Sequence, residues 1–261
     1  MTADLTLVWI QARRQLLGYV RNRRAVIFGV AMPIILLVLF NSIFVQGSDS
    51  VEVANHQVAA SAYFTGGMLA YSMLLSGFTS MAMSLVSLRE TGELKRRRGT
   101  PVPGWTFIAA MILRTALLIG AVTILMLAIS HFAYDVAIPA GSIGQILLYV
   151  VLGTTVFAAV GIAATAATTN IDSASGLLPF VAFLLSFISS IFVPLDQLPD
   201  WLADIGRIFP VYHVASGIQT ALAQGGSHPI DFSNLAVLAI WGVGATVIAT
   251  RTFRWEPQGD A

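Results

Sequence analysis

The stretch that decides the fold is residues 57–98. Its first part, residues 57–88, reads QVAASAYFTGGMLAYSMLLSGFTSMAMSLVSL and carries no charged side chain over 32 residues. Its second part, residues 89–98, reads RETGELKRRR and is mostly charged. A helix needs about 20 apolar residues to cross the hydrocarbon core of a bilayer. The first part therefore predicts a membrane-spanning helix, and the second part predicts a polar segment outside the bilayer.

The rest of the chain repeats this alternation of long apolar runs and short polar segments. Six runs are long enough to span a bilayer: residues 26–46, 60–87, 106–131, 145–169, 174–194 and 233–253. The pattern predicts an all-α membrane protein with six transmembrane helices. We expect residues 1–24 to form a separate cytoplasmic segment and residues 25–261 to form one six-span domain, whose first run is an uncleaved span.

The composition excludes several classes of protein. Of the 261 residues, 56% are hydrophobic and 10% are charged, compared with roughly 25% charged residues in a typical soluble domain. This chain cannot supply the charged surface of a soluble enzyme or a nucleic-acid-binding protein, and it is too apolar to be disordered. Because the chain has no cysteine, we expect no disulfide, thiolate metal site or thiol nucleophile. We find no catalytic motif and no metal-binding motif of the His-Glu-x-x-His type.

The basic residues predict the orientation in the membrane. Loops rich in arginine and lysine face the cytoplasm. With six spans, both termini lie on the same side of the membrane. If that side is the cytoplasm, 12 of the 14 basic residues face the cytoplasm. Arg207 then faces outward, and Arg114 lies early in the third span. A charge within a span indicates a functional site. The alternative is that Arg114, close to the cytoplasmic end, extends its side chain to the interface.

The N-terminal residues 5–22 predict an amphipathic helix. Apolar side chains recur there near helical spacing, whereas Arg13, Arg14 and Arg21 lie elsewhere on the helical wheel. Such a helix lies in the inner membrane interface with its arginines on anionic headgroups. A plain basic tail is the alternative interpretation.

Residues 89–103, between spans two and three, predict a short charged helix in the cytoplasm. Glu93 follows Arg89 by four residues and precedes Arg97 by four, a spacing that supports a helix through ion pairs. Pro101 then stops the helix. A basic loop that only sets the topology would explain the arginines, but it would not explain the acidic residues.

Residues 194–210, between spans five and six, predict an amphipathic helix at the outer interface. Its apolar side chains recur at helical spacing: Trp201, Leu202, Ile205, Ile208 and Phe209. Pro199 suits a helix start and Pro210 a helix end. We expect a helix over residues 199–209 and a short helical hairpin that partly re-enters the membrane.

Together these features resemble type-2 ABC exporter permeases over nearly the entire chain. The resemblance rests on the order of elements, on the Glu-x-Gly-x-Leu…Thr-Pro pattern from Glu90 to Pro101, and on the Pro-x-x-x-Leu-Pro-x-Trp-Leu-x-x-Ile…Pro pattern from Pro194 to Pro210. The segment GELKRRRGTP is most similar to the daunorubicin-resistance type of drug-efflux permease. Glu93 departs from that pattern, because we expect threonine there in much of the family.

The resemblance implies roles for these segments. The N-terminal helix would be a connecting helix, and segment 89–100 a coupling helix, both in contact with a separate ATPase subunit. The implied ATPase-coupling residues are Arg89, Glu90, Gly92, Glu93, Leu94, Arg97, Thr100 and Pro101. The outer helix would close the pathway, and its implied gate residues are Leu198, Pro199, Trp201, Leu202 and Ile205.

The resemblance also implies partners. The chain has no Gly-x-x-x-x-Gly-Lys-[Ser/Thr] phosphate loop, so ATP and magnesium would bind to the partner ATPase and this chain would hold no cofactor. A second permease copy, identical or related, would complete the pathway in the lipid of a bacterial plasma membrane, and no nucleic acid is involved. The implied function is ATP-driven export of hydrophobic drug-like or lipid-like molecules by alternating access.

Two sets of side chains are candidates for the pathway lining. Span two carries serines at four-residue steps, namely Ser72, Ser76, Ser80 and Ser84, and span five carries the aromatic pair Phe183 and Phe187. The serines could form a polar wall, or they could allow close helix packing. The aromatic rings could hold a flat hydrophobic substrate, or they could face lipid or a protein core.

Two alternative functions remain. The same ABC machinery could export a lipid-linked glycan or glycolipid. A secondary transporter or channel without an ATPase is less consistent with the sequence, because no acidic residue or histidine falls at mid-span, where ion coupling normally needs one.

Overall fold

The computed structural model of the chain describes residues 2–44, 50–54, 56–100, 102–223 and 229–253, and it is 83% helical. Six helices in this part of the chain are long and apolar enough to cross a membrane, which confirms the six predicted spans. They comprise Ile27–Phe44, Ala60–Glu90, Gly104–Tyr134, Ala140–Ala167, Ile171–Ile188 and Phe232–Thr252.

Three of these spans contain more than one helical element. Span one joins the π-helical η1 (Ile27–Ala31) and α3 (Met32–Phe44), and the short α2 (Arg23–Val26) precedes it. Span two joins α4 (Ala60–Met73), the π-helical η2 (Leu74–Ser80) and α5 (Met81–Glu90). Span four joins the 3-10 turn η3 (Ala140–Ser142), α8 (Ile143–Ala164) and the 3-10 turn η4 (Thr165–Ala167). Spans three, five and six are the single helices α7 (Gly104–Tyr134), α9 (Ile171–Ile188) and α12 (Phe232–Thr252).

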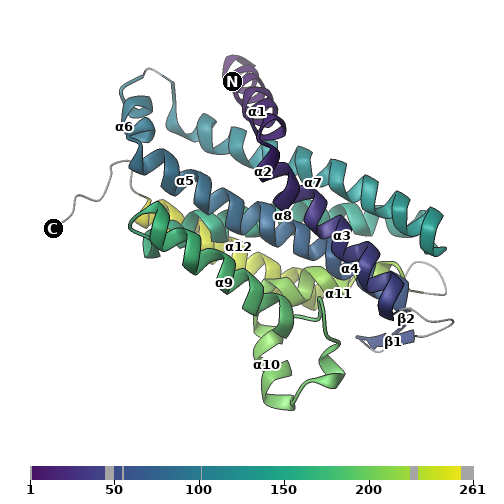
Figure 1. Ribbon diagram of the computed structural model, residues 1–261. Helices are drawn as coiled ribbons and strands as arrows, with labels where there is room; N and C mark the ends of the chain where they lie inside the picture. The colour runs from purple at the N-terminus through teal and green to yellow at the C-terminus, as the bar shows by residue number, and fades with distance from the viewer. Residues whose placement is uncertain (1, 45–49, 55, 101, 224–228, 254–261) are drawn as a thin grey trace.

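The remaining elements flank these spans. They are α1 (Thr2–Arg21), α6 (Glu93–Arg98), η5 (Leu195–Gln197), α10 (Asp200–Ile208), α11 (Pro210–Ala221) and the strands β1 (Ser50–Val53) and β2 (His56–Ala59). Figure 1 shows α6 at one end of the helix bundle and β1–β2 at the other. We call these the α6 end and the hairpin end.

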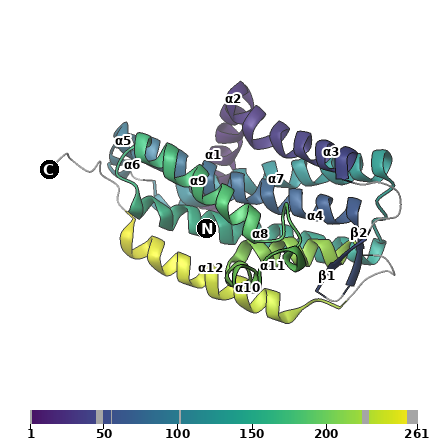
Figure 2. The ribbon, with the colours of Figure 1, turned by 60° about the horizontal axis from the view of Figure 1, so that its bottom comes forward.

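The centre of the bundle is made by spans two and four, which are the most buried of the six. Figure 2 shows α3 and α12 along opposite edges of the bundle, and both helices leave most of their surface exposed. Helix α11 is short but almost wholly buried, because only Tyr212 among its residues is not buried. A short helix thus supplies part of the core between the long ones.

Spans two and four approach each other closely at one glycine. A Cβ atom on Gly161 of α8 would lie 2.7 Å from the carbonyl oxygen of Phe78 and 2.9 Å from that of Gly77, both in η2. These distances are shorter than any normal contact of a Cβ atom, so only glycine fits here without a backbone shift. The contact places the π-helical segment of span two directly against span four.

The β1–β2 hairpin corrects the expectation of an all-α fold. The strands pair antiparallel, with Val51 opposite Val58, and the side chains of Val53 and Val58 are buried. Alternating β-branched residues favour a half-buried strand over a helix. The loop between spans one and two therefore contains a small sheet at the hairpin end, while the rest of the described chain is essentially helical.

Candidate functional site

The charged segment after span two forms a sharp corner between α5 and α6. Gly92 has a φ of 70°, in the left-handed region, and immediately precedes α6. Glycine reaches this region without the steric penalty that other residues meet. The Gly92 carbonyl also accepts the first hydrogen bond of α6, from the Arg96 amide at 3.1 Å. The sequence thus ends one helix and starts the next within two residues. The predicted short helix is present over Glu93–Arg98 only, because Arg89 belongs to α5 and does not share a helix with Glu93.

Helix α6 is anchored to the bundle by Leu94. Only 1% of Leu94 is exposed, and it packs among side chains from spans two, three, four and six, including Leu85, Met111, Ile162 and Ala249. Burial of a leucine side chain contributes about 2 kcal/mol. Since six residues make a marginal helix on their own, this contact fixes α6 on the ends of four spans.

Arg97 and Glu93 brace the outer side of α6. Arg97 donates hydrogen bonds to the Glu93 carboxylate at 2.6 and 3.2 Å, and its guanidinium lies 4.4 Å from the centre of the Phe107 ring on α7. Thr100 donates a hydrogen bond to the Arg97 carbonyl at 2.7 Å. Glu93 and Arg97 therefore stabilise α6 and attach it to span three.

Arg89 connects the same corner to the end of span four. Its side chain is 3% exposed, and its guanidinium donates hydrogen bonds to the carbonyl of Thr165 at 3.1 Å, to that of Thr168, and to that of Thr169 at 3.2 Å. These carbonyls lie at the C-terminal end of a helix, where a cation is favourable. The structure places Arg89 inside the protein and away from the surface that a partner could contact.

Glu90 connects the corner to the start of span five. Its carboxylate accepts a hydrogen bond of 2.8 Å from the backbone N–H of Ile171, the first residue of α9. An acidic group at a helix N-terminus is stabilised by the unpaired amides and by the helix dipole. Arg89 and Glu90 together tie span two to the junction between spans four and five.

The α5–α6 corner therefore connects the end of span two to spans three, four, five and six through a few side chains. Its described and exposed residues include Lys95, Arg96, Glu90 and Thr100. Pro101, the last of the predicted coupling residues, lies outside the described residues. A force applied to α6 would reach spans three to five through Arg97, Arg89 and Glu90.

The N-terminal helix α1 packs against the same end of span three. Val8 and Ala12 are buried against Ala110 of α7, and Tyr19 is buried further along the same face. Burial raises the pKa of the Tyr19 phenol above its ordinary value, an effect that the Arg114 guanidinium partly offsets. The other side of α1 exposes large apolar side chains, among them Leu5, Trp9 and Val20.

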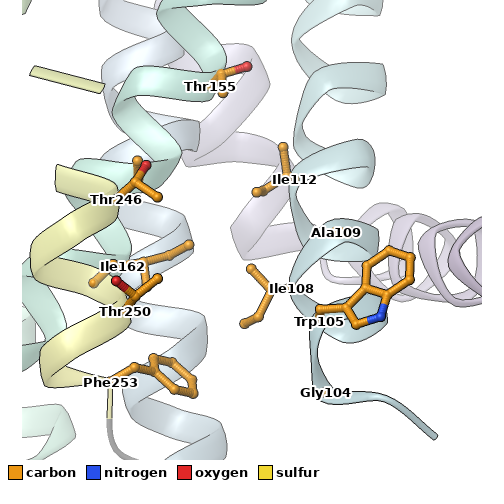
Figure 3. A pocket seen from close by; sticks show the side chains of 12 residues that line it. Gly104, Trp105, Ile108, Ala109, Ile112, Thr155, Ile162, Thr246, Thr250 and Phe253 are labelled. Atoms are coloured by element: carbon orange, nitrogen blue, oxygen red, sulfur yellow. The ribbon is translucent and has the colours of Figure 1, made fainter. Parts of the chain in front are cut away.

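An apolar groove of about 490 Å³ opens between α7, α8 and α12 near the α6 end. Figure 3 shows Ile108 and Ile112 of α7 opposite Ile162 of α8 and Phe253 at the end of α12. Small-molecule sites commonly have volumes of about 300 to 1,000 Å³ and mostly apolar walls. The groove is therefore large enough to accept a drug-sized or lipid-like molecule.

Helix α10 is present where the outer segment predicts it, and Figure 1 shows it projecting from the side of the bundle. Ala203 and Gly206 face the protein. Of the predicted gate residues, Pro199, Trp201 and Ile205 are exposed, whereas Leu198 and Leu202 are half-buried. The exposed apolar side chains form one edge of α10, which is the arrangement expected of a helix at a membrane surface.

Helix α11 follows α10 after one residue and is held by buried polar contacts. The Gln219 side-chain amide donates hydrogen bonds to the carbonyls of Tyr63 at 3.2 Å and Ser190 at 3.0 Å. The His213 Nε2 donates to the Arg207 carbonyl at 2.8 Å, and its Nδ1 lies 2.6 Å from the Asn234 side-chain amide. These contacts join the α10–α11 pair to spans two, five and six.

The candidate pathway residues fall into two environments. Ser72 and Ser76 are buried, and Ser80 and Ser84 are half-buried. The four serines do not follow one regular α-helical row, because the π-helical η2 lies among them. In contrast, Phe183 and Phe187 are 57% and 41% exposed, with ring centres 4.8 Å apart, on a helix that is mostly exposed.

The residues that bind Arg89 and Glu90 cannot be identified from the charged motif alone. Thr165, Thr168 and Ile171 act through backbone carbonyl and amide groups, which carry no residue-type signal. A detectable signal is the start of α9, where Asn170 and Ser173 form a capping box. Asparagine with serine three residues later, directly before an apolar run, predicts a helix start.

Two comparisons with known proteins identify the family. Residues 6–222 match the ABC-2 type transporter family. The chain is also 24% identical over 208 residues to a Bacillus subtilis (strain 168) protein named "Putative transport permease YvfS", and the aligned region covers 79% of this chain and 81% of that protein. The family consists of transport permeases and implies an ABC ATPase as the partner. Since the family match covers most of the described chain, the protein belongs to the ABC-2 type transporter family.

Proposed function

We propose that this chain is the permease subunit of an ATP-driven exporter that moves hydrophobic, drug-like or lipid-like molecules out of a bacterial cell. Membership of the family supports the permease role and the ATPase partner. The observation that carries the coupling mechanism is the α5–α6 corner, which exposes a basic surface and is bonded internally to the ends of several spans. Both termini and the α6 end face the cytoplasm in this proposal.

In the proposed mechanism, α6 is the coupling helix and α1 the connecting helix. The ATPase contacts the exposed Lys95, Arg96 and Glu90. Movement of α6 is transmitted to span four by Arg89 and to span five by Glu90. Gly92 allows the sharp turn, and Leu94 with the braced pair of Glu93 and Arg97 holds α6 on the bundle, so that α6 moves with the spans.

The proposed cargo is hydrophobic and enters from the bilayer. Its support is the apolar groove of about 490 Å³, which is open at the side of the bundle and lined mostly by apolar side chains. Helix α10 closes the outer end of the pathway in this proposal, and a second permease copy, identical or related, completes it. The fit to a drug-efflux subgroup rests on the GELKRRRGTP segment.

Transport by a double variant tests this function. The chain is co-expressed with the ATPase of its complex, and ATP-dependent uptake of daunorubicin is measured in inverted membrane vesicles. Wild type should accumulate the drug, and the Glu90→Ala plus Glu93→Ala variant should not, although its membrane insertion stays intact. A matched Asp200→Ala plus Asp204→Ala variant, which removes two acids from α10, keeps the α6 end unchanged.

The possible results separate the two parts of the proposal. Normal uptake by the Glu90→Ala plus Glu93→Ala variant would show that the corner does not transmit the force. ATP hydrolysis without drug uptake by wild type would contradict a daunorubicin-type cargo and leave the coupling mechanism in place.

A further inference from the structure

A polar cavity of about 400 Å³ lies between α1 and the α6 ends of spans two and three. Its lining differs from that of the apolar groove, because most of its side chains carry hydroxyl, amide or charged groups. The polar lining residues are Gln15, Tyr19, Asn22, Ser80, Ser84, Ser87, Glu93, Arg97 and Arg114. Such a lining favours a small polar ligand.

Arg114 is the one lining side chain whose charge is not balanced by the protein. It is only 8% exposed, and its Nε has no hydrogen-bond partner. In the described chain no carboxylate forms an ion pair with it. The Tyr19 ring lies 5.5 Å from the guanidinium, and such a contact contributes about 0.5 to 2 kcal/mol. A buried, unpaired charge costs several kcal/mol, so the ring alone does not compensate for the burial.

The charges around the cavity favour an anion. Glu93 also lines the cavity, but its carboxylate is paired with Arg97 at 2.6 Å. These two charges balance, which leaves the charge of Arg114 in excess. A guanidinium binds phosphate oxygens through paired N–H groups, and the serine hydroxyls can donate further hydrogen bonds.

The length of α7 allows the cavity to lie at the depth of phospholipid headgroups. Helix α7 has 31 residues, or about 46 Å at 1.5 Å per residue, whereas the hydrocarbon core is about 30 Å thick. Arg114 lies ten residues after Gly104, about 15 Å along α7 from its start. Helix α7 is thus about 16 Å longer than the hydrocarbon core is thick. If this extra length projects from the membrane at the α6 end, Arg114 lies near the membrane surface.

We infer that this cavity binds a phosphate group, with Arg114 as its charge partner. The bound group joins α1 to spans two and three and thereby fixes the N-terminal helix on the bundle. An anionic phospholipid headgroup and free inorganic phosphate share this chemistry, and the experiment distinguishes them. The inference does not depend on the cargo or on the ATPase.

The experiment uses two matched pairs of variants of the full-length chain. Gly18 lines the cavity, and a Cβ atom added there meets no heavy atom within 4 Å. Gly18→Glu therefore adds a negative charge at the cavity without a steric clash, and Gly18→Gln adds a side chain of the same size without the charge. The second pair is Arg114→Gln and Arg251→Gln, since Arg251 is exposed and does not line the cavity.

Each protein is reconstituted in nanodiscs of phosphatidylcholine, with or without phosphatidylglycerol. Native mass spectrometry measures the retained phosphatidylglycerol, and thermal unfolding is recorded in both lipids and in phosphatidylcholine with inorganic phosphate. Wild type, Gly18→Gln and Arg251→Gln should retain phosphatidylglycerol and unfold at a higher temperature with it. Gly18→Glu and Arg114→Gln should bind about tenfold more weakly, as expected for about 1.4 kcal/mol of lost attraction.

The source of the phosphate follows from the lipid and phosphate arms. Stabilisation by phosphatidylglycerol alone identifies a lipid headgroup as the ligand. Stabilisation by inorganic phosphate in phosphatidylcholine identifies the free ion. In both cases the Gly18→Glu variant must lose the stabilisation. Equal retention and equal unfolding temperatures within the Gly18 pair would overturn the inference. The Gly18 pair decides the outcome even if Arg114→Gln does not fold.

Discussion

Arg89 and Glu90 are neighbours in the sequence, but they act on different helices. Arg89 satisfies carbonyl groups at the end of span four, and Glu90 satisfies an amide at the start of span five. Charge-assisted hydrogen bonds of this kind are stronger than neutral ones. Two adjacent residues thus fix the geometry of a loop about 80 positions later in the chain.

Replacement of Arg89 should reveal this internal role. Arg89→Ala leaves several carbonyls without their donor, and we expect a loss of about 2 to 4 kcal/mol in the free energy of unfolding. Arg89→Lys keeps the charge but cannot reach several carbonyls at once, so it should recover only part of the loss. Thermal unfolding in detergent measures both. Arg96→Ala, at an exposed position of α6, is the control, and equal stability of Arg89→Ala and Arg96→Ala would contradict the role.

The approach of η2 to span four gives a second prediction for a single residue. Gly161→Ala places a Cβ atom 2.7 Å from a backbone oxygen, so the helices must separate, and we expect a loss of about 1 to 3 kcal/mol. Gly120→Ala is the matched control, because the added Cβ atom meets nothing within 4 Å. It should be neutral or stabilising by up to about 1 kcal/mol. Thermal unfolding of the two variants should therefore shift apart; equal midpoints would show that the contact is not tight.

Among the elements, the long apolar helices are predictable from the sequence, and their irregularities are not. Long apolar runs with at most one charged residue predict six spans, which the structure confirms. The π-helical η2 packs against Gly161 of span four, and span five ends at Ile188, two residues before Ser190, whose φ is 60°. The hairpin could have been suspected from the alternating valines at Val51 and Val53, but four-residue strands give a weak signal.

The candidate site was predictable as a segment but not as a set of contacts. The spacing of Glu93 and Arg97 predicts their ion pair, which the structure contains. The burial of Leu94 and Arg89 depends on helices that are distant in the sequence, so no local pattern reveals it. The same limit applies to Gln219, whose partners Tyr63 and Ser190 come from other elements.

The proposed outer position of α10 can be tested by labelling. The chain has no native cysteine, so Asp204→Cys introduces a single thiol, at a side chain that is 72% exposed. A membrane-impermeant thiol reagent should label it in intact cells. Lys95→Cys, on the exposed part of α6, should be labelled only in inverted vesicles. The reverse pattern would reverse the orientation of the whole chain.

At the scale of the whole molecule, burial is uneven among the spans. Spans two and four form the core, whereas spans one, five and six expose most of their surface. The exposed side chains of α9 include three phenylalanines, at positions 180, 183 and 187. A single chain therefore offers wide apolar surfaces, which lipid and the proposed second copy would cover.

The central claim is that the α5–α6 corner receives force from an ATPase, and co-purification tests it most directly. The tagged chain is extracted with its native neighbours in a mild detergent, and the associated proteins are identified and quantified. We predict a phosphate-loop ATPase in near-equimolar amount with wild type, and its loss from the Glu90→Ala plus Glu93→Ala variant. A chain that purifies alone, under conditions in which other ABC complexes stay intact, would contradict the account.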